Sequence, residues 1–270
     1  MKEVSLIICF IINIIICFGI PFGTLIYIII NKKNAGKSFF VGTCVFFIFQ
    51  VLIRMPLLRY VLSQMEWYNV MASANPIEYG LFLGLTAGLF EEVGRFLGFK
   101  IILQKNLRWI DGIVFGIGHG GMEAVLFVGV SCIQNLMMLI SLNNGILNYT
   151  QIGMSEQSVR ASFATTTNVM VLMGGVERIF TFIIHAGLTL IILHGIKKNK
   201  FIYLGLAIFI HTIVDSAVVI LPKVFNIGII EIELFIGMLA LLILIYIVKS
   251  IKIFERLEGV NINEKFDKSN

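Results

Sequence analysis

The stretch GIGHGGMEAV, residues 116–125, places a histidine and a glutamate one helical turn apart inside an apolar segment. Its glycines, together with Gly112, remove side-chain bulk from a helix, so that neighbouring backbones can approach closely. His119 and Glu123 are spaced i,i+4 and therefore project from one face of that helix. Charged groups at the bilayer centre are costly, by about 3 kcal/mol each on insertion scales. We therefore expect this pair to face other polar groups within a bundle of helices.

The composition around this stretch is typical of an integral membrane protein. Of the 270 residues, 58% are hydrophobic and 14% are charged, and the mean hydropathy is +0.93. So few charged residues cannot cover a water-facing surface, whereas runs of about 20 apolar residues can each cross the hydrocarbon core. The sequence predicts an all-α membrane protein, a polytopic bundle of about seven transmembrane helices. The predicted helices cover residues 5–31, 38–64, 79–104, 109–140, 168–196, 201–222 and 228–250.

The basic residues predict how this bundle is oriented. They gather in the first, third and fifth connections and near the C-terminus, at Lys32, Lys33, Lys37, Lys105, Arg108, Lys197, Lys198, Lys200, Lys249, Lys252, Arg256, Lys265 and Lys268. The alternate connections, 65–78, 141–167 and 223–227, hold one basic residue at most. By the positive-inside rule, the N-terminus lies outside and the C-terminus lies in the cytoplasm. A net charge of +5 confined to short loops and a tail does not indicate nucleic-acid binding.

The chain is predicted to form one transmembrane helical bundle over residues 1–255, followed by a polar cytoplasmic tail over residues 256–270. The core that carries the chemistry is expected within residues 79–222. The 141–167 connection is the one long loop, and its polar composition suits either a lid or a solvated link. We expect a multi-pass protein of the plasma membrane.

Four of the predicted helices, the third to the sixth, carry ionisable residues that could meet in one site. These are Glu91, Glu92, Arg95, His119, Glu123, Glu177, Arg178, His185, His211 and Asp215. Counted from the nearest basic connection, one residue in each helix lies about 11 to 13 positions into the membrane, which corresponds to roughly 16–20 Å. These four residues are Glu92, His119, His185 and His211. Because residues with independent structural roles have no reason to share a depth, the coincidence predicts one composite site.

This set of residues suits the hydrolysis of a peptide bond, which needs an activated water, a general base and an oxyanion stabiliser. A buried glutamate, Glu91 or Glu92, can serve as the base. Neutral histidines on facing helices can hold Zn²⁺ with one position left for water, and the predicted ligands are His119, His185 and His211. A metal-free mechanism, in which a glutamate and a histidine activate the water, remains open. The usual HExxH helix of zinc proteases is absent from the sequence.

The motifs themselves resemble two related families. EEVGR at 91–95, FGIGH at 115–119 and HTIVD at 211–215 are similar to the EExxxR, FxxxH and HxxxN/D motifs of the CPBP intramembrane proteases, which include the type II CAAX prenyl endopeptidases. The combination of these motifs with GHGGMEA, and with ER ahead of a histidine in the fifth helix, resembles the YhfC family of intramembrane metalloproteases. The resemblance spans roughly residues 79–222.

The resemblance implies that Glu91 and Glu92 belong to the water-activating motif, with His119 as their partner. It also implies that His211 and Asp215 bind metal or stabilise the oxyanion.

The sequence departs from the CPBP pattern in two places. Only two residues separate Glu92 from Arg95, where the CPBP motif has three, and this turns the arginine by about 100° on the helix. An aspartate at Asp215 is an acceptor, which suits a metal or a histidine partner better than an oxyanion. Glu123, Glu177 and Arg178 are expected to support the site, as is Arg95.

The function predicted from these residues is an intramembrane endopeptidase acting on a membrane-embedded or lipid-modified peptide or protein. The alternative is a proton- or metal-coupled transporter, because carboxylates and histidines in membranes also relay protons. No internal repeat supports alternating access. The polar pairs also have purely structural interpretations, such as a buried ion pair between Arg95 and a neighbouring glutamate. Arg54, in the second predicted helix, either snorkels outwards or pairs with carboxylates of the site.

Overall fold

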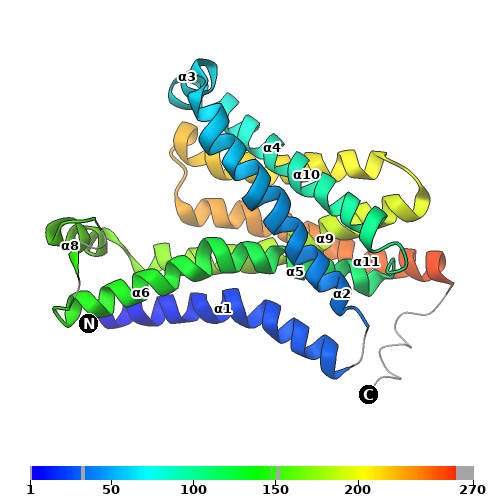
Figure 1. The fold of residues 1–270 in the computed structure, drawn as a ribbon, viewed down its shortest axis with the longest axis horizontal. Coiled ribbons are helices and arrows are strands. Elements are labelled where there is room, and N and C mark those ends of the chain that lie inside the picture. The colour runs from blue at the N-terminus through cyan, green and yellow to red at the C-terminus, as the bar shows by residue number, and fades with distance from the viewer. Residues whose placement is uncertain (1, 32–33, 147, 150–152, 260–270) are drawn as a thin grey trace.

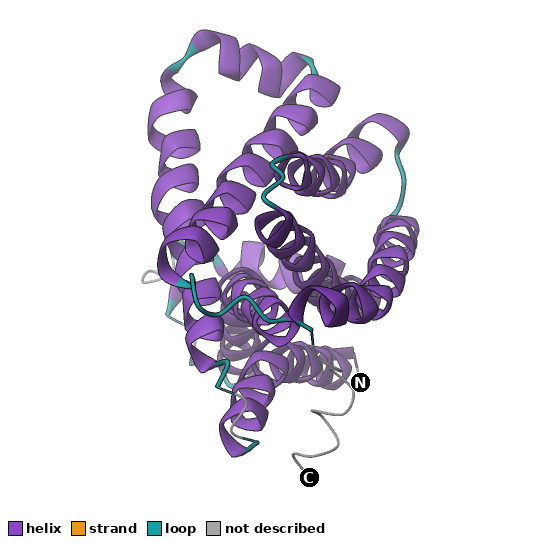
Figure 2. Ribbon diagram, turned by 90° about the vertical axis from the view of Figure 1, so that its right-hand side faces the viewer, coloured by secondary structure: helices purple, strands orange, loops and turns teal. Residues whose placement is uncertain are grey.

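The computed structural model describes residues 2–31, 34–146, 148–149 and 153–259, and Figures 1 and 2 show that helices dominate throughout. No strand occurs in these described ranges. The elements are α1 (Lys2–Ile30), α2 (Gly36–Phe46), η1 (Phe47–Arg54), η2 (Leu57–Val61), η3 (Leu62–Gln64), α3 (Glu66–Ala74), α4 (Pro76–Leu97), η4 (Gly98–Ile102), α5 (Trp109–Glu123), η5 (Ala124–Gly129), α6 (Val130–Asn143), α8 (Glu156–Thr165), α9 (Asn168–Lys198), α10 (Ile202–Phe225) and α11 (Ile229–Glu258).

Among the described residues, six continuous helices are long and apolar enough to cross a membrane. They are Glu3–Ile30, Gly36–Gln64, Trp109–Asn143, Asn168–Lys198, Ile202–Phe225 and Ile229–Glu258. The predicted helix 79–104 corresponds to α4 with η4, which is equally continuous but carries Glu91, Glu92 and Arg95 near its middle. The prediction of an all-α bundle of about seven helices is therefore confirmed, while its orientation in the membrane stays a prediction.

Two short helices were not predicted. The helix α3 lies in the 65–78 connection, and α8 lies in the 141–167 connection. Figure 1 shows α3 and α8 towards the left of the molecule, whereas the C-terminal end of α11 lies towards the right. Residues 260–270 of the predicted polar tail lie outside the described residues.

The helix α9 is the centre of the bundle. In its most apolar window 67% of the residues are buried, against 22–33% in the other five apolar spans. A continuous run from Ile184 to Leu193 is buried, so this helix is enclosed on all sides. It packs against α1, α5, α10 and α11, while α4 packs mainly on α10 and α2 on α5. Polar side chains that α9 carries are therefore screened from lipid by its neighbours.

The glycines of α5 bring its backbone into contact with two other helices. A Cβ atom added at Gly116 would lie 2.5 Å from the Cα atom of Ala186 in α9. One added at Gly118 would lie 2.2 Å from the carbonyl oxygen of Phe39 in α2. Because both neighbours are backbone atoms, neither position tolerates a side chain without moving a helix. The expected close approach around His119 is thus present.

Helix ends follow from local side-chain chemistry. The Thr167 hydroxyl caps α9 by accepting a hydrogen bond from the backbone N–H of Met170, at 3.2 Å. Asn199 and Asn226, which follow α9 and α10, adopt left-handed φ angles of 53° and 50°. Asparagine tolerates this conformation better than most residues and so ends helices well. The two turns send α9, α10 and α11 back and forth across the bundle.

Three of the long helices change from α-helical to π-helical geometry beside ionisable residues. The segment η1 ends at Arg54, η5 begins directly after Glu123, and η4 begins three residues after Arg95. π-Helical turns are rare and occur frequently at functional sites. The local geometry of these helices therefore deviates where their polar residues lie.

We predict that Gly116→Ala destabilises the protein by about 2 kcal/mol or more, because the added methyl group would overlap the backbone of Ala186. Gly205→Ala is the matched control, since Gly205 also lies within a long helix but has no neighbouring atom within 4 Å of the place that the methyl group would take. Thermal unfolding of the detergent-purified variants measures the difference. Equal transition temperatures for the two variants would contradict the close helix contact.

Candidate active site

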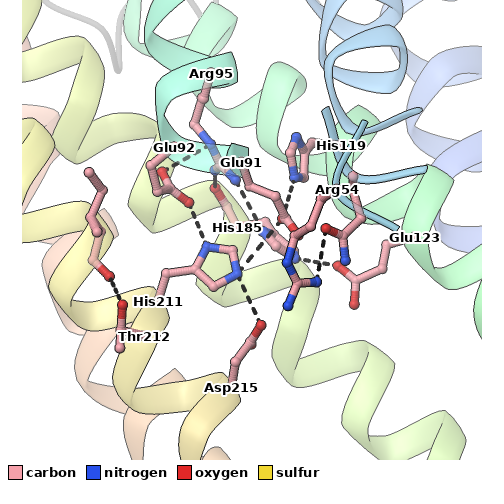
Figure 3. A network of polar contacts seen from close by, with 12 residues as sticks. Arg54, Glu91, Glu92, Arg95, His119, Glu123, His185, His211, Thr212 and Asp215 are labelled. Carbon is pink, nitrogen blue, oxygen red and sulfur yellow. Dashed lines mark hydrogen bonds and ion pairs between the residues drawn. The ribbon is translucent and has the colours of Figure 1, made fainter. Parts of the chain in front are cut away.

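Polar residues from four helices converge at the middle of the bundle, as Figure 3 shows. The helix α4 contributes three of them, α5 two, α9 two and α10 two: Glu91, Glu92, Arg95, His119, Glu123, Arg178, His185, His211 and Asp215. The ring centroids of His119 and His185 are 4.9 Å apart, and those of His185 and His211 are 5.7 Å apart. The shared depth inferred from the sequence therefore corresponds to a shared location.

The most compact group is Glu91, His119 and His185, three buried residues from which one potential ligand atom each lies within 4.8 Å of the others. Two imidazoles and a carboxylate are a donor set that zinc uses, and ligand atoms around a tetrahedral zinc lie about 3.4 Å apart. The group therefore fits a metal ion after a modest contraction. The sequence predicted His211 as the third metal ligand, whereas this group contains Glu91 instead.

His119 is held by its carboxylate neighbour through one ring nitrogen only. Its Nε2 atom lies 2.9 Å from Oε2 of Glu91. Its Nδ1 atom is buried and has no hydrogen-bond partner in the described part of the chain. Because a buried polar atom without a partner is costly, a bound ion or water molecule would satisfy it. The ring also packs edge-on against Phe46, with centroids 5.2 Å apart.

His211 belongs to a second arrangement, which Glu92 organises. Its Nδ1 atom lies 2.7 Å from Oε1 of Glu92. The other ring nitrogen, Nε2, lies 3.7 Å from Oε2 of Glu91 and 3.6 Å from Oδ2 of Asp215. The imidazole is therefore oriented by one carboxylate and directed towards two others.

Arg95 connects these two arrangements. Its Nε atom lies 3.2 Å from Oε2 of Glu92, and its NH1 group donates to the carbonyl oxygen of His185 at 2.7 Å and to Oγ1 of Thr189 at 2.6 Å. The changed spacing relative to the CPBP motif thus does not separate the arginine from the glutamate. It places the guanidinium between Glu92 on α4 and His185 on α9.

The contacts of His185 determine its tautomer. Arginine can only donate hydrogen bonds, so Nδ1 of His185, 3.2 Å from NH2 of Arg95, must accept one. The proton then sits on Nε2, which donates to Oε2 of Glu123 at 2.6 Å. A metal ion bound to His185 would replace this Nε2 proton and would lie beside the Glu123 carboxylate. Glu123 is therefore closer to the metal group than the sequence analysis placed it.

The remaining charged residues form a chain leading away from His185. NH1 of Arg178 donates to Oε1 of Glu123 at 2.5 Å, and NH2 of Arg178 contacts Oε1 of Glu177. Arg178 thereby neutralises Glu123 and holds it against the histidine. The supporting role expected for Glu123, Glu177 and Arg178 stays a prediction, and the structure places Glu123 in direct contact with His185.

Sequence reasoning missed Gln50 and left the position of Arg54 open. Arg54 is buried, with 7% of the residue exposed, so it does not snorkel to the surface. It donates to Oε1 of Gln50 at 3.1 Å, to Oγ1 of Thr86 at 3.1 Å and to the carbonyl oxygen of Leu83 at 2.7 Å. No carboxylate of the described residues forms an ion pair with it. The i,i+4 spacing of Gln50 and Arg54 in an apolar segment was the signal that could have identified the pair.

A cavity of about 150 Å³ adjoins these groups and is large enough for several water molecules. Its polar lining includes Glu91, Glu123, His185, His211 and Asp215. In contrast, Glu92 and Arg95 are fully buried behind this wall. The arrangement therefore brings carboxylates and imidazoles together along one cavity that has room for water.

Comparison with known proteins relates this arrangement to a family. The family described as YhfC intramembrane metalloprotease matches residues 16–252. The chain is 30% identical over 248 residues to an uncharacterized membrane protein, YhfC, of Bacillus subtilis (strain 168), and the match covers 89% of this chain and 94% of that protein. No solved structure matches. The region matched by the family contains every residue labelled in Figure 3.

We predict that Arg95→Gln lowers the free energy of unfolding by about 3–5 kcal/mol, because it leaves the buried carboxylate of Glu92 without its cation. The matched control is Arg160→Gln, since Arg160 also pairs with a glutamate on its own helix but is exposed. Thermal or denaturant-induced unfolding in detergent measures both. If the two substitutions have the same effect, Arg95 does not hold α4 and α9 together.

Proposed function

The chain belongs to the YhfC intramembrane metalloprotease family, and from this premise we propose that it is a multi-pass endopeptidase of the plasma membrane. It hydrolyses a peptide bond in a membrane-embedded or lipid-modified polypeptide. The observation that carries this proposal is the buried group of Glu91, His119 and His185 beside a cavity large enough for water. A structural ion pair needs no adjoining cavity, whereas a hydrolase needs space for water and substrate.

Glu91, His119 and His185 are the residues that would hold the metal ion, for which we propose Zn²⁺. When bound, Zn²⁺ would supply a Lewis acid that activates water and polarises the peptide carbonyl. The proximity of Nε2 of His119 to Glu91 and the replaceable Nε2 proton of His185 support this assignment. A metal-free mechanism, in which Glu91 and His119 activate the water, would use two of these three residues.

Of the two adjacent glutamates, Glu91 is the better base. It lines the cavity, whereas both oxygen atoms of Glu92 are directed at buried partners, His211 and Arg95. Oε2 of Glu91 lies near His119, and its second carboxylate oxygen is left to take a proton from the attacking water. The carboxylate of Glu92 instead orients the imidazole that faces Glu91.

We assign the return of that proton to His211. Its Nε2 atom lies 3.7 Å from Glu91 and 3.6 Å from Asp215, on the side of the ring that faces the cavity. Glu92, bound at Nδ1, holds the ring in this orientation. The imidazole can therefore carry a proton from the Glu91 carboxylate to the departing amine, as a general acid must.

Arg54 is the cation that we assign to the developing oxyanion. Its neutral partners Gln50, Thr86 and Leu83 use three of the five guanidinium N–H donors, which leaves two for a substrate. Figure 3 shows its guanidinium on the side of the site where Glu123 and Asp215 lie. Donors held in place before reaction are the most effective stabilisers of such charge.

The central test compares new protein N-termini in the membranes of cells that produce the wild-type protein, Glu91→Gln or His119→Ala. We expect a set of membrane-protein cleavage products with the wild type that both substitutions abolish, together with zinc in the purified wild type and little zinc in His119→Ala. Glu156→Gln is the control, because Glu156 lies on the exposed surface of α8 and pairs with Arg160. Identical sets of N-termini in all four strains would refute the protease assignment, and ion uptake into proteoliposomes that depends on Glu91 would replace it with a carrier.

A second substitution tests the oxyanion assignment. We predict that Arg54→Gln slows cleavage by roughly 10²–10³-fold while the zinc content stays unchanged, because a charged donor at the oxyanion is lost. Arg59→Gln, one turn further along the same helix at an exposed position, serves as the control. The measurement is the cleavage rate of a substrate identified by the first test. Cleavage at the wild-type rate by Arg54→Gln would remove Arg54 from the mechanism.

A further inference from the structure

The cavity extends from the site histidines towards one side of the bundle only. On α9 its lining runs from His185 back to Glu177, and on α10 it runs from His211 forward to Val218. These two helices are antiparallel, so both stretches lead to the same side. From α5 into η5, the lining from Glu123 to Phe127 leads there as well. This side carries α3 and α8 and is the one that the basic residues predict to be extracytoplasmic (Figure 1).

The opposite side of the site is closed by apolar side chains. Phe99, Leu103, Phe115, Leu190 and Leu193 form part of one core cluster, and each is 0% exposed. The ring of Phe115 stacks on Phe99, with centroids 4.7 Å apart, and on the site histidine His119, with centroids 6.4 Å apart. The lining of the cavity includes none of these five side chains, so among the described residues the cavity does not continue through this cluster.

The acidic side chains along this part of the lining are more exposed than the two glutamates of α4 at the site. Glu92 is 0% exposed and Glu91 4%, whereas Glu123 is 16%, Glu177 27% and Asp215 39% exposed. Glu177 lies eight residues from His185 on α9, which corresponds to about 12 Å along the helix. Water therefore reaches further into the vestibule, the part of the cavity between Glu123 and Val218, than into the metal group.

We propose that substrate and water enter the site through this vestibule, from the side that carries α3 and α8. The substrate class, which rests on the proposed function, is then a membrane-anchored polypeptide whose scissile bond lies in the outer half of the bilayer. Cleavage at this depth releases the product on the extracytoplasmic side. The apolar cluster around Phe115 keeps water and the polypeptide from continuing to the cytoplasm.

Site-directed labelling tests the direction of entry without any catalytic assay. Val218 lines the vestibule, so Val218→Cys is placed in a Cys44→Ser background, because Cys44 is exposed while the other three cysteines are buried. Intact cells and inside-out membrane vesicles are each treated with a membrane-impermeant thiol reagent, so that the two sides are probed separately. Lys223→Cys and Lys200→Cys, near the two ends of α10, report the two sides of the membrane. Phe209→Cys is the matched control, since Phe209 is exposed on α10 but does not line the cavity.

We expect Val218→Cys to be labelled from the same side as Lys223→Cys, and Phe209→Cys to remain unlabelled. Labelling of Val218→Cys from the Lys200 side, or equally from both sides, overturns the proposal. The proposal is also overturned if Val218→Cys does not react with a small membrane-permeant maleimide while Lys223→Cys, in equally well folded protein, does. Because labelling does not require turnover, adding Glu91→Gln leaves the result unchanged. One-sided labelling in a protein that cleaves nothing would therefore preserve the entry route and reject only the protease assignment.

Discussion

The arrangement of the site depends on the burial of the Arg95 guanidinium. A charge at mid-membrane is tolerated only when partners surround it, and Arg95 finds Glu92 on its own helix and the backbone and ring of His185 on α9. These contacts join α4 to the central helix and leave Nε2 of His185 directed at Glu123. Through Glu92, the same arginine also positions His211. One cation thus sets the orientation of two histidines that lie on different helices.

This polar arrangement requires helices that lie unusually close together. The carbonyl oxygen of Phe39 and the backbone of Ala186 lie where side chains at Gly118 and Gly116 would otherwise be, so α2, α5 and α9 meet at backbone distance. Close backbones bring His119 and His185 within reach of each other although they lie on different helices. The π-helical segments η1 and η5 then adjust the neighbouring turns at Arg54 and Glu123. Small residues and wide turns have complementary roles: the former bring helices together, and the latter redirect side chains.

Hydropathy predicted the long helices because spanning a bilayer requires apolar length, and counting residues from the basic connections predicted that the site histidines meet. Which atoms face one another depends on rotamers and helix rotation, which such counting does not specify. For this reason the sequence grouped His211 with the metal ligands, whereas the structure groups Glu91 there and binds His211 to Glu92. Gln50 was missed because a neutral amide in a hydrophobic run looked isolated. The helix α8 was missed because its polar sequence suits a loop as well as a surface helix.

The one-sided cavity also bears on the choice between a hydrolase and a carrier. A carrier must open its site to each side in turn, and here the closed side consists of Phe99, Phe115 and Leu190, which belong to the main packed core. Opening that side would separate α5 from α9 where Gly116 holds them at backbone contact. A hydrolase has no such requirement, because its substrate and products can use one entrance. The packing that assembles the histidines is therefore the same packing that closes the site on the side of Phe99 and Leu190.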